Sequence, residues 1–132
     1  MSPPLDLDPK HLVLVVDDEP VVRKVAARVL LSAGYEVREV GDGQQALDFL
    51  QVGNLNVDVV VSDIVMPRLN GVELLETLSR SHPDLPVILM TGYGAADLEA
   101  RGIAPPCSLL AKPFLPEQLI AEVERCIREK AA

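Results

Sequence analysis

The sequence contains no tryptophan, and aromatic residues make up only 3% of its 132 residues. Valine, leucine, isoleucine and alanine must therefore fill the interior, since hydrophobic residues still account for 48% of the chain. A single domain of this length buries roughly two thirds of the surface of its unfolded chain. The composition therefore predicts one packed domain with an aliphatic core.

Positive charge is scarce, with 12 Lys and Arg against 20 Asp and Glu and a formal net charge of −8. An acidic chain without a basic cluster argues against direct binding to nucleic acid or to an anionic membrane. No apolar run approaches the roughly 18 residues of a membrane-spanning helix, and the N-terminus lacks the basic and apolar regions of a signal peptide. We expect a cytoplasmic protein without a membrane partner, in which the proline-containing residues 1–10 form a loose leader.

Cysteine and histidine are nearly absent. Cys107 and Cys126 stand alone, without neighbours at the spacing of a metal site, and His11 and His82 are far apart. Isolated cysteines in a cytosolic protein are usually reduced. We therefore expect two reduced thiols in the core or on a helix, and two histidines with structural roles.

Short apolar runs alternate with segments of helical periodicity along the chain. A β-branched run that is apolar throughout is typical of a strand buried on both faces of a parallel sheet. The expected strands cover residues 12–16, 35–40, 57–63, 87–90 and 109–111. Five strands alternating with helices predict an α/β fold, with a parallel sheet covered by helices on both faces.

Helix signals separate these strands. Pro20 suits the first turn of a helix that ends at Gly34, and Pro116 opens the last helix. Asp42 with Gln45, and Asn70 with Glu73, have the spacing of capping boxes. These boxes predict helices from Asp42 through Leu50 and from Asn70 to about Ser81, and residues 95–101 favour a helix of about two turns.

Four of the five strands end on a side chain that can carry chemistry: Asp17 with Asp18, Asp63, Thr91 and Lys112. Parallel strands place their carboxyl ends at one edge of the sheet, where open α/β folds bind ligands. Three carboxylates about 5 Å apart repel one another by roughly 3 kcal/mol per pair at an effective dielectric constant near 20. Hard oxygen ligands without thiolate or imidazole favour Mg²⁺, and a carboxylate beside a metal, an ammonium and a hydroxyl suits phosphoryl transfer.

These motifs together resemble the receiver domain of bacterial two-component response regulators. The matching features are the acidic pair Asp17-Asp18 before Glu19-Pro20, Asp63 with Pro67 and Gly71 beyond it, Thr91-Gly92, and Lys112-Pro113-Phe114. The resemblance covers about residues 11–129. It implies a flavodoxin-like (βα)5 doubly wound sheet of five parallel strands in the order 2-1-3-4-5.

The resemblance also implies roles for the strand-end residues. Asp63 would accept a phosphoryl group from the phosphohistidine of a sensor histidine kinase or histidine phosphotransfer protein. Asp18, Asp63 and the backbone carbonyl of Val65 would hold Mg²⁺, with Asp17 acting through water. Thr91 and Lys112 would bind the phosphoryl oxygens, and the Lys112–Pro113 bond would be cis.

Such a domain is not an enzyme acting on separate substrates, because it catalyses only its own phosphorylation and dephosphorylation. The implied partners are the kinase and a downstream protein target bound by the fourth helix, fifth strand and last helix, with a weak or phosphorylation-dependent dimer as a further option. The sequence departs from the family at Leu109, where an aromatic residue is common, so the usual threonine–aromatic switch cannot operate. Leu115 stands where a capping side chain would normally precede Pro116.

Other interpretations stay open. A haloacid-dehalogenase phosphatase would need an acidic residue two positions after Asp63, where this chain has Val65. A flavodoxin would need a phosphate loop where this chain has Asp17-Asp18-Glu19. A degenerate receiver that only binds partners, and a receiver that is part of a hybrid histidine kinase, are the remaining alternatives.

Overall fold

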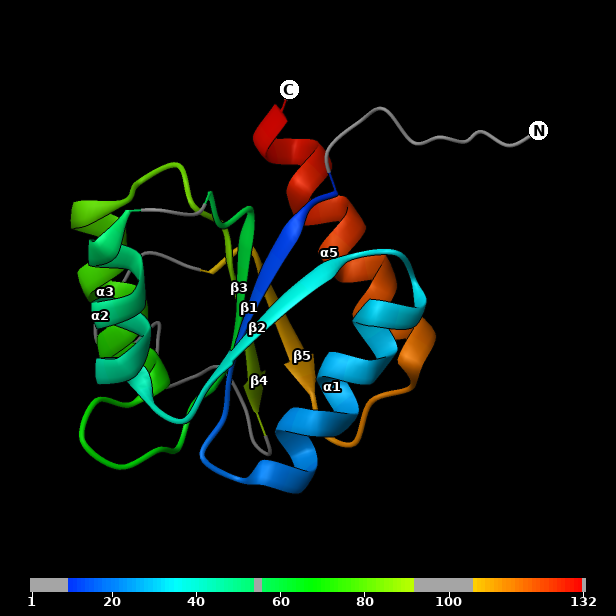
Figure 1. The fold of residues 1–132 in the computed structure, drawn as a ribbon, viewed down its shortest axis with the longest axis horizontal. Coiled ribbons are helices and arrows are strands. Elements are labelled where there is room, and N and C mark those ends of the chain that lie inside the picture. Colours follow the sequence, from blue (N-terminus) through cyan, green and yellow to red (C-terminus); the bar gives the residue numbers. More distant parts are fainter. Residues whose placement is uncertain (1–9, 54–55, 92–105, 132) are drawn as a thin grey trace.

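The computed structural model describes residues 10–53, 56–91 and 106–131. Five parallel strands form one sheet in the order β2-β1-β3-β4-β5 (Figure 1), which confirms the flavodoxin-like arrangement. The strands are β1 Leu12–Val16, β2 Glu36–Val40, β3 Val59–Asp63, β4 Val87–Thr91 and β5 Ser108–Ala111. The doubly wound topology brings the carboxyl ends of β1 and β3 side by side at the centre of one edge.

Helices cover both faces of this sheet. Helices α2 and α3 lie on one face, and α1 and α5 lie on the other (Figure 1). Their bounds are α1 Pro20–Ser32, α2 Gly43–Val52, α3 Gly71–Ser81 and α5 Pro116–Ala131. The helix expected over residues 95–101 lies outside the described residues. Among the helices that are described, none is long and apolar enough to cross a bilayer.

The core forms two layers because successive residues of a strand point to opposite faces of the sheet. Along β1, Leu12, Leu14 and Val16 pack toward α2 and α3, whereas Val13 and Val15 pack toward α1 and α5. All five residues of β1 are buried, as expected for a central strand of a parallel sheet. Full burial of each such aliphatic side chain contributes roughly 1.5–3 kcal/mol, so these layers hold the strand ends in place.

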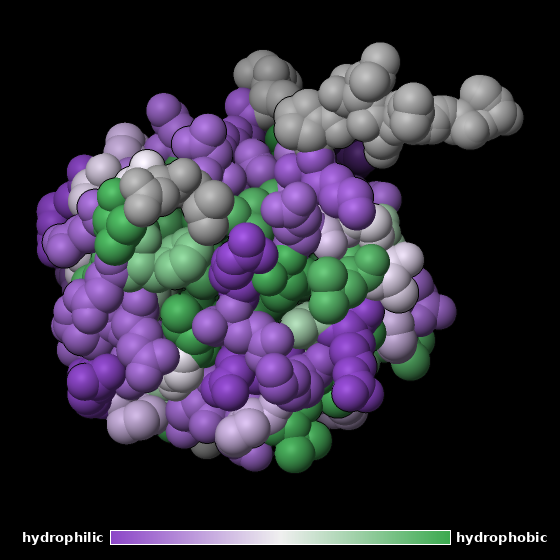
Figure 2. All heavy atoms as spheres, viewed as in Figure 1, coloured by the Kyte–Doolittle hydropathy of each residue, from purple (hydrophilic) through white to green (hydrophobic). Residues whose placement is uncertain are grey.

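The edge strand β2 is the most polar of the five, with Glu36, Arg38 and Glu39 among its residues. Figure 2 shows hydrophilic side chains over most of the visible face, with apolar side chains mainly toward the middle of the view, around β2. Charged residues on an edge strand oppose pairing with a further strand. The alternation expected over residues 35–40 is therefore that of an edge strand.

The helix caps agree with the sequence in part. Asn70 and Glu73 form the complete predicted capping box at the start of α3. Asp42 accepts the N–H of Gln45 as predicted, but the Gln45 side chain accepts from Gly41 instead of completing the box at Asp42. Leu115 supplies no capping side chain, yet its own N–H donates to the Gln118 side chain at 2.7 Å, so one end of α5 is half capped.

The prediction of two reduced thiols is wrong for this structure. Cys107, just before β5, and Cys126, in α5, form a disulfide with a Cα–Cα distance of 6.1 Å. The sequence-based argument relied on the usual reduced state of isolated cysteines in the cytosol, but α5 packs against β5 and brings the two residues together. His11 Nδ1 lies 3.5 Å from Asp58 Oδ2 at the amino end of the sheet, and His82 Nδ1 lies 2.8 Å from the hydroxyl of Ser81. The structural roles of both histidines stay a prediction.

Candidate functional site

Three carboxylates meet at the carboxyl edge of the sheet. Asp17 and Asp18 follow β1 directly, and Asp63 is the last residue of β3. Val16 is paired with Ser62 in the register of β1 and β3, so the next residues of the two strands lie beside each other. Asp17, Asp18 and Asp63 each place an oxygen within 4.8 Å of the others, as the strand-end argument predicted.

Lys112 brings a positive charge into this acidic group. It follows the last residue of β5, and its Nζ lies 3.2 Å from Asp63 Oδ1 and 3.7 Å from Asp17 Oδ2. The peptide bond between Lys112 and Pro113 is cis, as the family resemblance implied. One ammonium thus faces two carboxylates, and the cluster keeps an excess of negative charge.

Asp17 is the most constrained of the three acids, because its side chain is fully buried. Its Oδ1 accepts the N–H of Glu19 at 2.9 Å, whereas its buried Oδ2 has no hydrogen-bond partner among the described residues. The contact of Oδ2 with Lys112 is an ion pair too long to be a hydrogen bond. A buried oxygen in this condition is the type of atom that a bound cation or water would satisfy.

The pKa of Asp17 is raised above its ordinary value. Burial is the largest cause, and the neighbouring charges of Asp63 and Asp18 act in the same direction. The N–H of Glu19 and the ammonium of Lys112 lower the pKa, but they do not outweigh the burial. The charged form of Asp17 is therefore costly in the metal-free protein.

The loop after Asp63 carries Val65, whose side chain is 69% exposed. Its start is fixed because the N–H of Ile64 donates to Asp63 Oδ1 at 2.9 Å and the N–H of Gly71 donates to the carbonyl of Ile64 at 2.8 Å. A Cβ at Gly71 would overlap the carbonyl oxygen of Asp63, so only glycine allows this close approach. The loop that would supply the Val65 carbonyl is thus held firmly beside the acidic cluster.

Thr91 is the last residue of β4 and is only 8% exposed. Its carbonyl accepts the N–H of Lys112 at 2.8 Å, so the ends of β4 and β5 are joined at this point. Asp63 pairs with Met90 in the register of β3 and β4, which places Thr91 one residue beyond it. The structure therefore brings the three acids and Lys112 into one group, and it puts Thr91 at the adjacent strand end.

Two arginines support this edge, and the sequence analysis did not identify them. Arg23 donates to the carbonyl of Asp17 at 2.8 Å. Arg68, in the loop after Asp63, has a left-handed backbone with φ of 66° and forms an ion pair with Asp42 at 2.9 Å. Burial raises the pKa of Asp42, but the N–H of Gln45 and the Arg68 guanidinium outweigh it and lower that pKa. No local pattern in the sequence signals either arginine, because each contact joins different elements.

Comparison with known proteins agrees with this geometry. The family model of the response regulator receiver domain matches residues 13–124. The chain is 39% identical over 127 residues to the sensor kinase CckA of Brucella abortus (strain 2308), covering 95% of this chain and 13% of that protein. It is 37% identical over 117 residues to the response regulator MprA of Mycobacterium sp. (strain KMS), covering 88% of this chain and 50% of that protein.

The chain therefore spans half or less of the length of these two relatives. A crystal structure of a response regulator receiver domain protein from Clostridium thermocellum superposes with a TM-score of 0.81 at 27% identity. That superposition covers 92% of this chain and 97% of the other. The chain thus belongs to the response regulator receiver domain family, the signalling domains of two-component systems.

Proposed function

We propose that this domain accepts a phosphoryl group on Asp63 from the phosphohistidine of a sensor histidine kinase or histidine phosphotransfer protein. The observation that carries the proposal is the position of Asp63 between the acidic pair and Lys112. The N–H of Ile64 and the ammonium of Lys112 both contact Oδ1, which leaves Oδ2 outside these two contacts. A carboxylate oriented in this way can act as a nucleophile without giving up either contact.

The acidic cluster fits a hard divalent cation. Its donors are carboxylate oxygens within 4.8 Å of one another, and one of them, Asp17 Oδ2, is buried without a hydrogen bond from the described residues. Oxygen donors of this kind suit Mg²⁺. Asp18, Asp63 and the backbone carbonyl of Val65 would hold the ion, with Asp17 acting through water. When bound, Mg²⁺ neutralises the charge on the phosphoryl oxygens.

Lys112 and Thr91 complete the proposed site. The Lys112 ammonium, already 3.2 Å from Asp63, would offset negative charge that develops on the phosphoryl oxygens during transfer. The Thr91 hydroxyl would donate a hydrogen bond to one of those oxygens. Because the N–H of Lys112 donates a hydrogen bond to the Thr91 carbonyl, a movement of either residue would affect the other.

The domain would therefore be a phosphoacceptor that catalyses only its own phosphorylation and dephosphorylation. We place the receiver at residues 11–129, after a leader over residues 1–10, and we propose a cytoplasmic location. Its partners would be the kinase and a downstream protein bound by the face that includes β5 and α5. Leu109 on β5 is not aromatic, so the switch would act through Thr91 and not through an aromatic side chain.

A second candidate is that the chain serves as the receiver of a hybrid histidine kinase. The similarity to the CckA sensor kinase favours it, because this chain corresponds to a small part of that longer protein. The phosphoacceptor chemistry would be the same in both cases. An aspartate-nucleophile phosphatase is less well supported, since Val65 occupies the position of its second acid.

The proposal is tested by intact-mass analysis after incubation with acetyl phosphate. We expect one phosphoryl group per chain in the presence of Mg²⁺, and none after chelation or in Asp63→Asn. Glu19→Gln, which removes an exposed carboxylate next to the site, is the matched control and should be phosphorylated normally. Phosphorylation of Asp63→Asn to the wild-type level would show that the acceptor lies elsewhere.

A further inference from the structure

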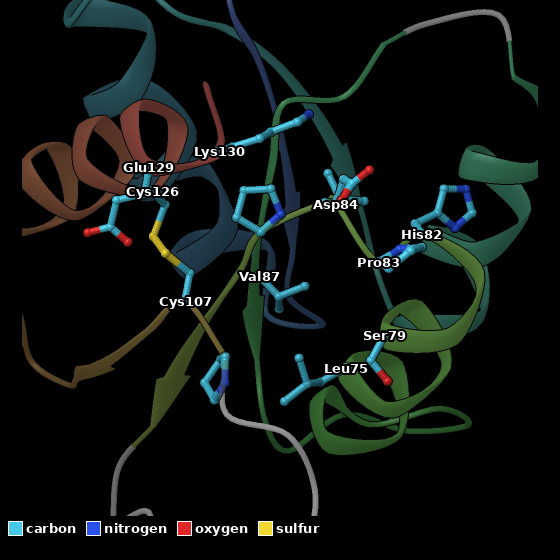
Figure 3. A pocket seen from close by; sticks show the side chains of 13 residues that line it. Leu75, Ser79, His82, Pro83, Asp84, Val87, Cys107, Cys126, Glu129 and Lys130 are labelled. Carbon is cyan, nitrogen blue, oxygen red and sulfur yellow. A yellow bond between two sulfur atoms is a disulfide. The ribbon is translucent and has the colours of Figure 1, made fainter. Parts of the chain in front are cut away.

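The disulfide between Cys107 and Cys126 joins the start of β5 to the middle of α5 (Figure 3). It lies at the amino ends of the strands, near Val87 at the start of β4, whereas the acidic cluster lies at their carboxyl ends. The proposed phosphoacceptor chemistry makes no use of it. Whatever the disulfide does can therefore be separated experimentally from phosphorylation of Asp63.

Non-covalent contacts hold the same two elements together without the disulfide. An Arg125 guanidinium nitrogen donates to the carbonyl of Cys107 at 2.8 Å, and the Ser108 hydroxyl donates to the Glu122 carboxylate at 2.7 Å. The N–H of Cys107 also donates to the carbonyl of Val87 at 2.8 Å. With these contacts in place, cleavage of the sulfur–sulfur bond would leave the two thiols next to each other, ready to pair again.

The disulfide is also accessible from a cavity. Both cysteines line a cavity of about 820 Å³ between α3, the loop before β4 and the end of α5. Figure 3 shows the sulfur atoms at its wall, with Glu129 and Lys130 on the neighbouring turn of α5. Cys126 is 1% exposed, whereas Cys107 is partly exposed and lies at the more open end of the disulfide, which makes Cys107 the cysteine that we assign to first attack.

We propose that Cys107 and Cys126 form a reversible thiol–disulfide exchange site for small thiols that enter through this cavity. The reductant's thiolate attacks Cys107 Sγ, the sulfur–sulfur bond breaks, and Cys126 leaves as a thiolate that takes up a proton. A second reductant thiol then attacks the mixed disulfide and releases Cys107. Two electrons pass from the small thiols to the protein, and the reductant becomes a disulfide.

The redox state would set how firmly α5 is anchored to β5. The disulfide closes a loop between residues 19 positions apart, and its loss should lower the melting temperature by roughly 10 °C. Because β5 leads directly to Lys112 and α5 packs on the same layer as α1, reduction would loosen one face of the domain without removing any residue of the acidic cluster. A disulfide in a cytosolic protein is typically transient or redox-sensing, which fits this role.

Native-state reduction kinetics test the proposal. The folded protein would be treated with dithiothreitol at increasing urea concentrations below the unfolding transition, and free thiols would be counted by maleimide labelling and mass. We expect reduction at a rate independent of urea, full reoxidation by oxidised glutathione, and no labelling of the Cys107→Ser, Cys126→Ser double variant. Reduction only in proportion to global unfolding, or free thiols in oxidising buffer, would overturn the proposal.

The entry route can be tested separately with two charge variants. Lys130 lines the cavity beside two carboxylates, Asp84 and Glu129, so reversing its charge would make the cavity strongly repel anionic thiols. Lys24 is an exposed lysine on α1, away from the cavity. Lys130→Glu should slow reduction by glutathione several-fold and reduction by dithiothreitol less, because the attacking thiolate of glutathione carries the larger negative charge. Lys24→Glu should change neither rate. Equal slowing by both variants would show that net charge, and not the cavity, governs access.

Discussion

Two clusters of acidic and basic side chains lie at opposite ends of this small domain and differ in how well their charges are satisfied. At the carboxyl edge of the sheet, Lys112 pairs with two of the three carboxylates, and a buried oxygen of Asp17 lacks a hydrogen bond from the described residues. Between β5 and α5, Arg125 pairs with both Glu122 and Glu129 and also donates to the Cys107 carbonyl. In the first cluster a buried acceptor has no donor among the described residues, whereas in the second both Ser108 and Arg125 donate to Glu122.

The directions of the pKa shifts express this difference. Burial raises the pKa of Asp17, whereas the Ser108 hydroxyl and the Arg125 guanidinium lower the pKa of Glu122. A carboxylate with a lowered pKa stabilises the fold in its charged form, and one with a raised pKa destabilises it. We conclude that the β5–α5 cluster is structural and that the acidic edge keeps an unfavourable charge arrangement that a cation can relieve.

The largest expected effect is on the metal dependence of stability. Mg²⁺ at about 100 times its dissociation constant should raise the free energy of unfolding of the wild type by about 2.7 kcal/mol. Asp18→Asn removes a proposed direct ligand and should lose most of this gain, while Glu19→Gln should keep it. Urea denaturation with Mg²⁺ and with a chelator measures the difference. Equal stabilisation of all three proteins would show that Asp18 is not a ligand of the cation, and no stabilisation of the wild type would show that the acidic cluster does not bind Mg²⁺.

The second largest effect is on the stability that the β5–α5 cluster of Arg125, Glu122 and Glu129 contributes. Arg125→Met should lower the free energy of unfolding by about 1–2 kcal/mol, because Glu122 loses its cation and the Cys107 carbonyl loses its donor. Arg128→Met, an exposed position on the same helix, should change stability by less than about 0.5 kcal/mol. If the two variants are equally stable, the contacts of Arg125 in the β5–α5 cluster contribute nothing to the free energy of unfolding beyond helix propensity.

A smaller effect of opposite sign is expected at the acidic edge. Asp17→Asn keeps an oxygen to accept the N–H of Glu19 but removes the buried charge. In metal-free buffer this variant should be more stable than the wild type by about 1 kcal/mol. Thermal unfolding with a chelator measures the gain. A loss of stability would show that neighbouring groups already stabilise the Asp17 charge. The charges of both clusters would then be favourable, contrary to the comparison.

The smallest effect is the pH dependence of stability, which should have opposite signs at Asp17 and Glu122. The pKa of Asp17 is raised in the native state, so the metal-free wild type loses stability relative to Asp17→Asn as the pH rises above 3.8, the ordinary pKa of an aspartate. The pKa of Glu122 is lowered, so the wild type gains stability relative to Glu122→Gln as the pH rises through the folded-state pKa. Each change should be about 1 kcal/mol or less. Denaturation curves from acidic to neutral pH would reveal the opposite slopes, and slopes of the same sign would contradict the comparison.

Much of the fold could be predicted from the sequence because its signals are local. The β-branched run before Asp63 and the Asn70–Glu73 capping box each act within a few residues, and the structure contains both. The strand order came from the family resemblance, since local patterns do not specify it. The expected strand from residue 57 begins at Val59 instead, and just before it the side chain of Asp58, not a backbone carbonyl, accepts the N–H of Leu12.

The convergence of Asp17, Asp18, Asp63 and Lys112 was also predictable, since parallel strands share one carboxyl edge. The contacts of Arg68 and Arg125 were not predictable, because each depends on how a helix or loop packs against a distant element. The disulfide was missed for the same reason. No sequence pattern around Cys107 or Cys126 indicates that α5 packs against β5 at these two positions.

The most direct test of the central claim is to locate the phosphoryl group in the wild-type protein. Borohydride reduces an aspartyl phosphate to homoserine, which remains in the chain and can be mapped by peptide mass spectrometry. After treatment with acetyl phosphate and Mg²⁺, we predict homoserine at position 63 and unmodified aspartate at positions 17 and 18. Homoserine at position 17 or 18, or at position 63 to the same extent without Mg²⁺, would contradict the account.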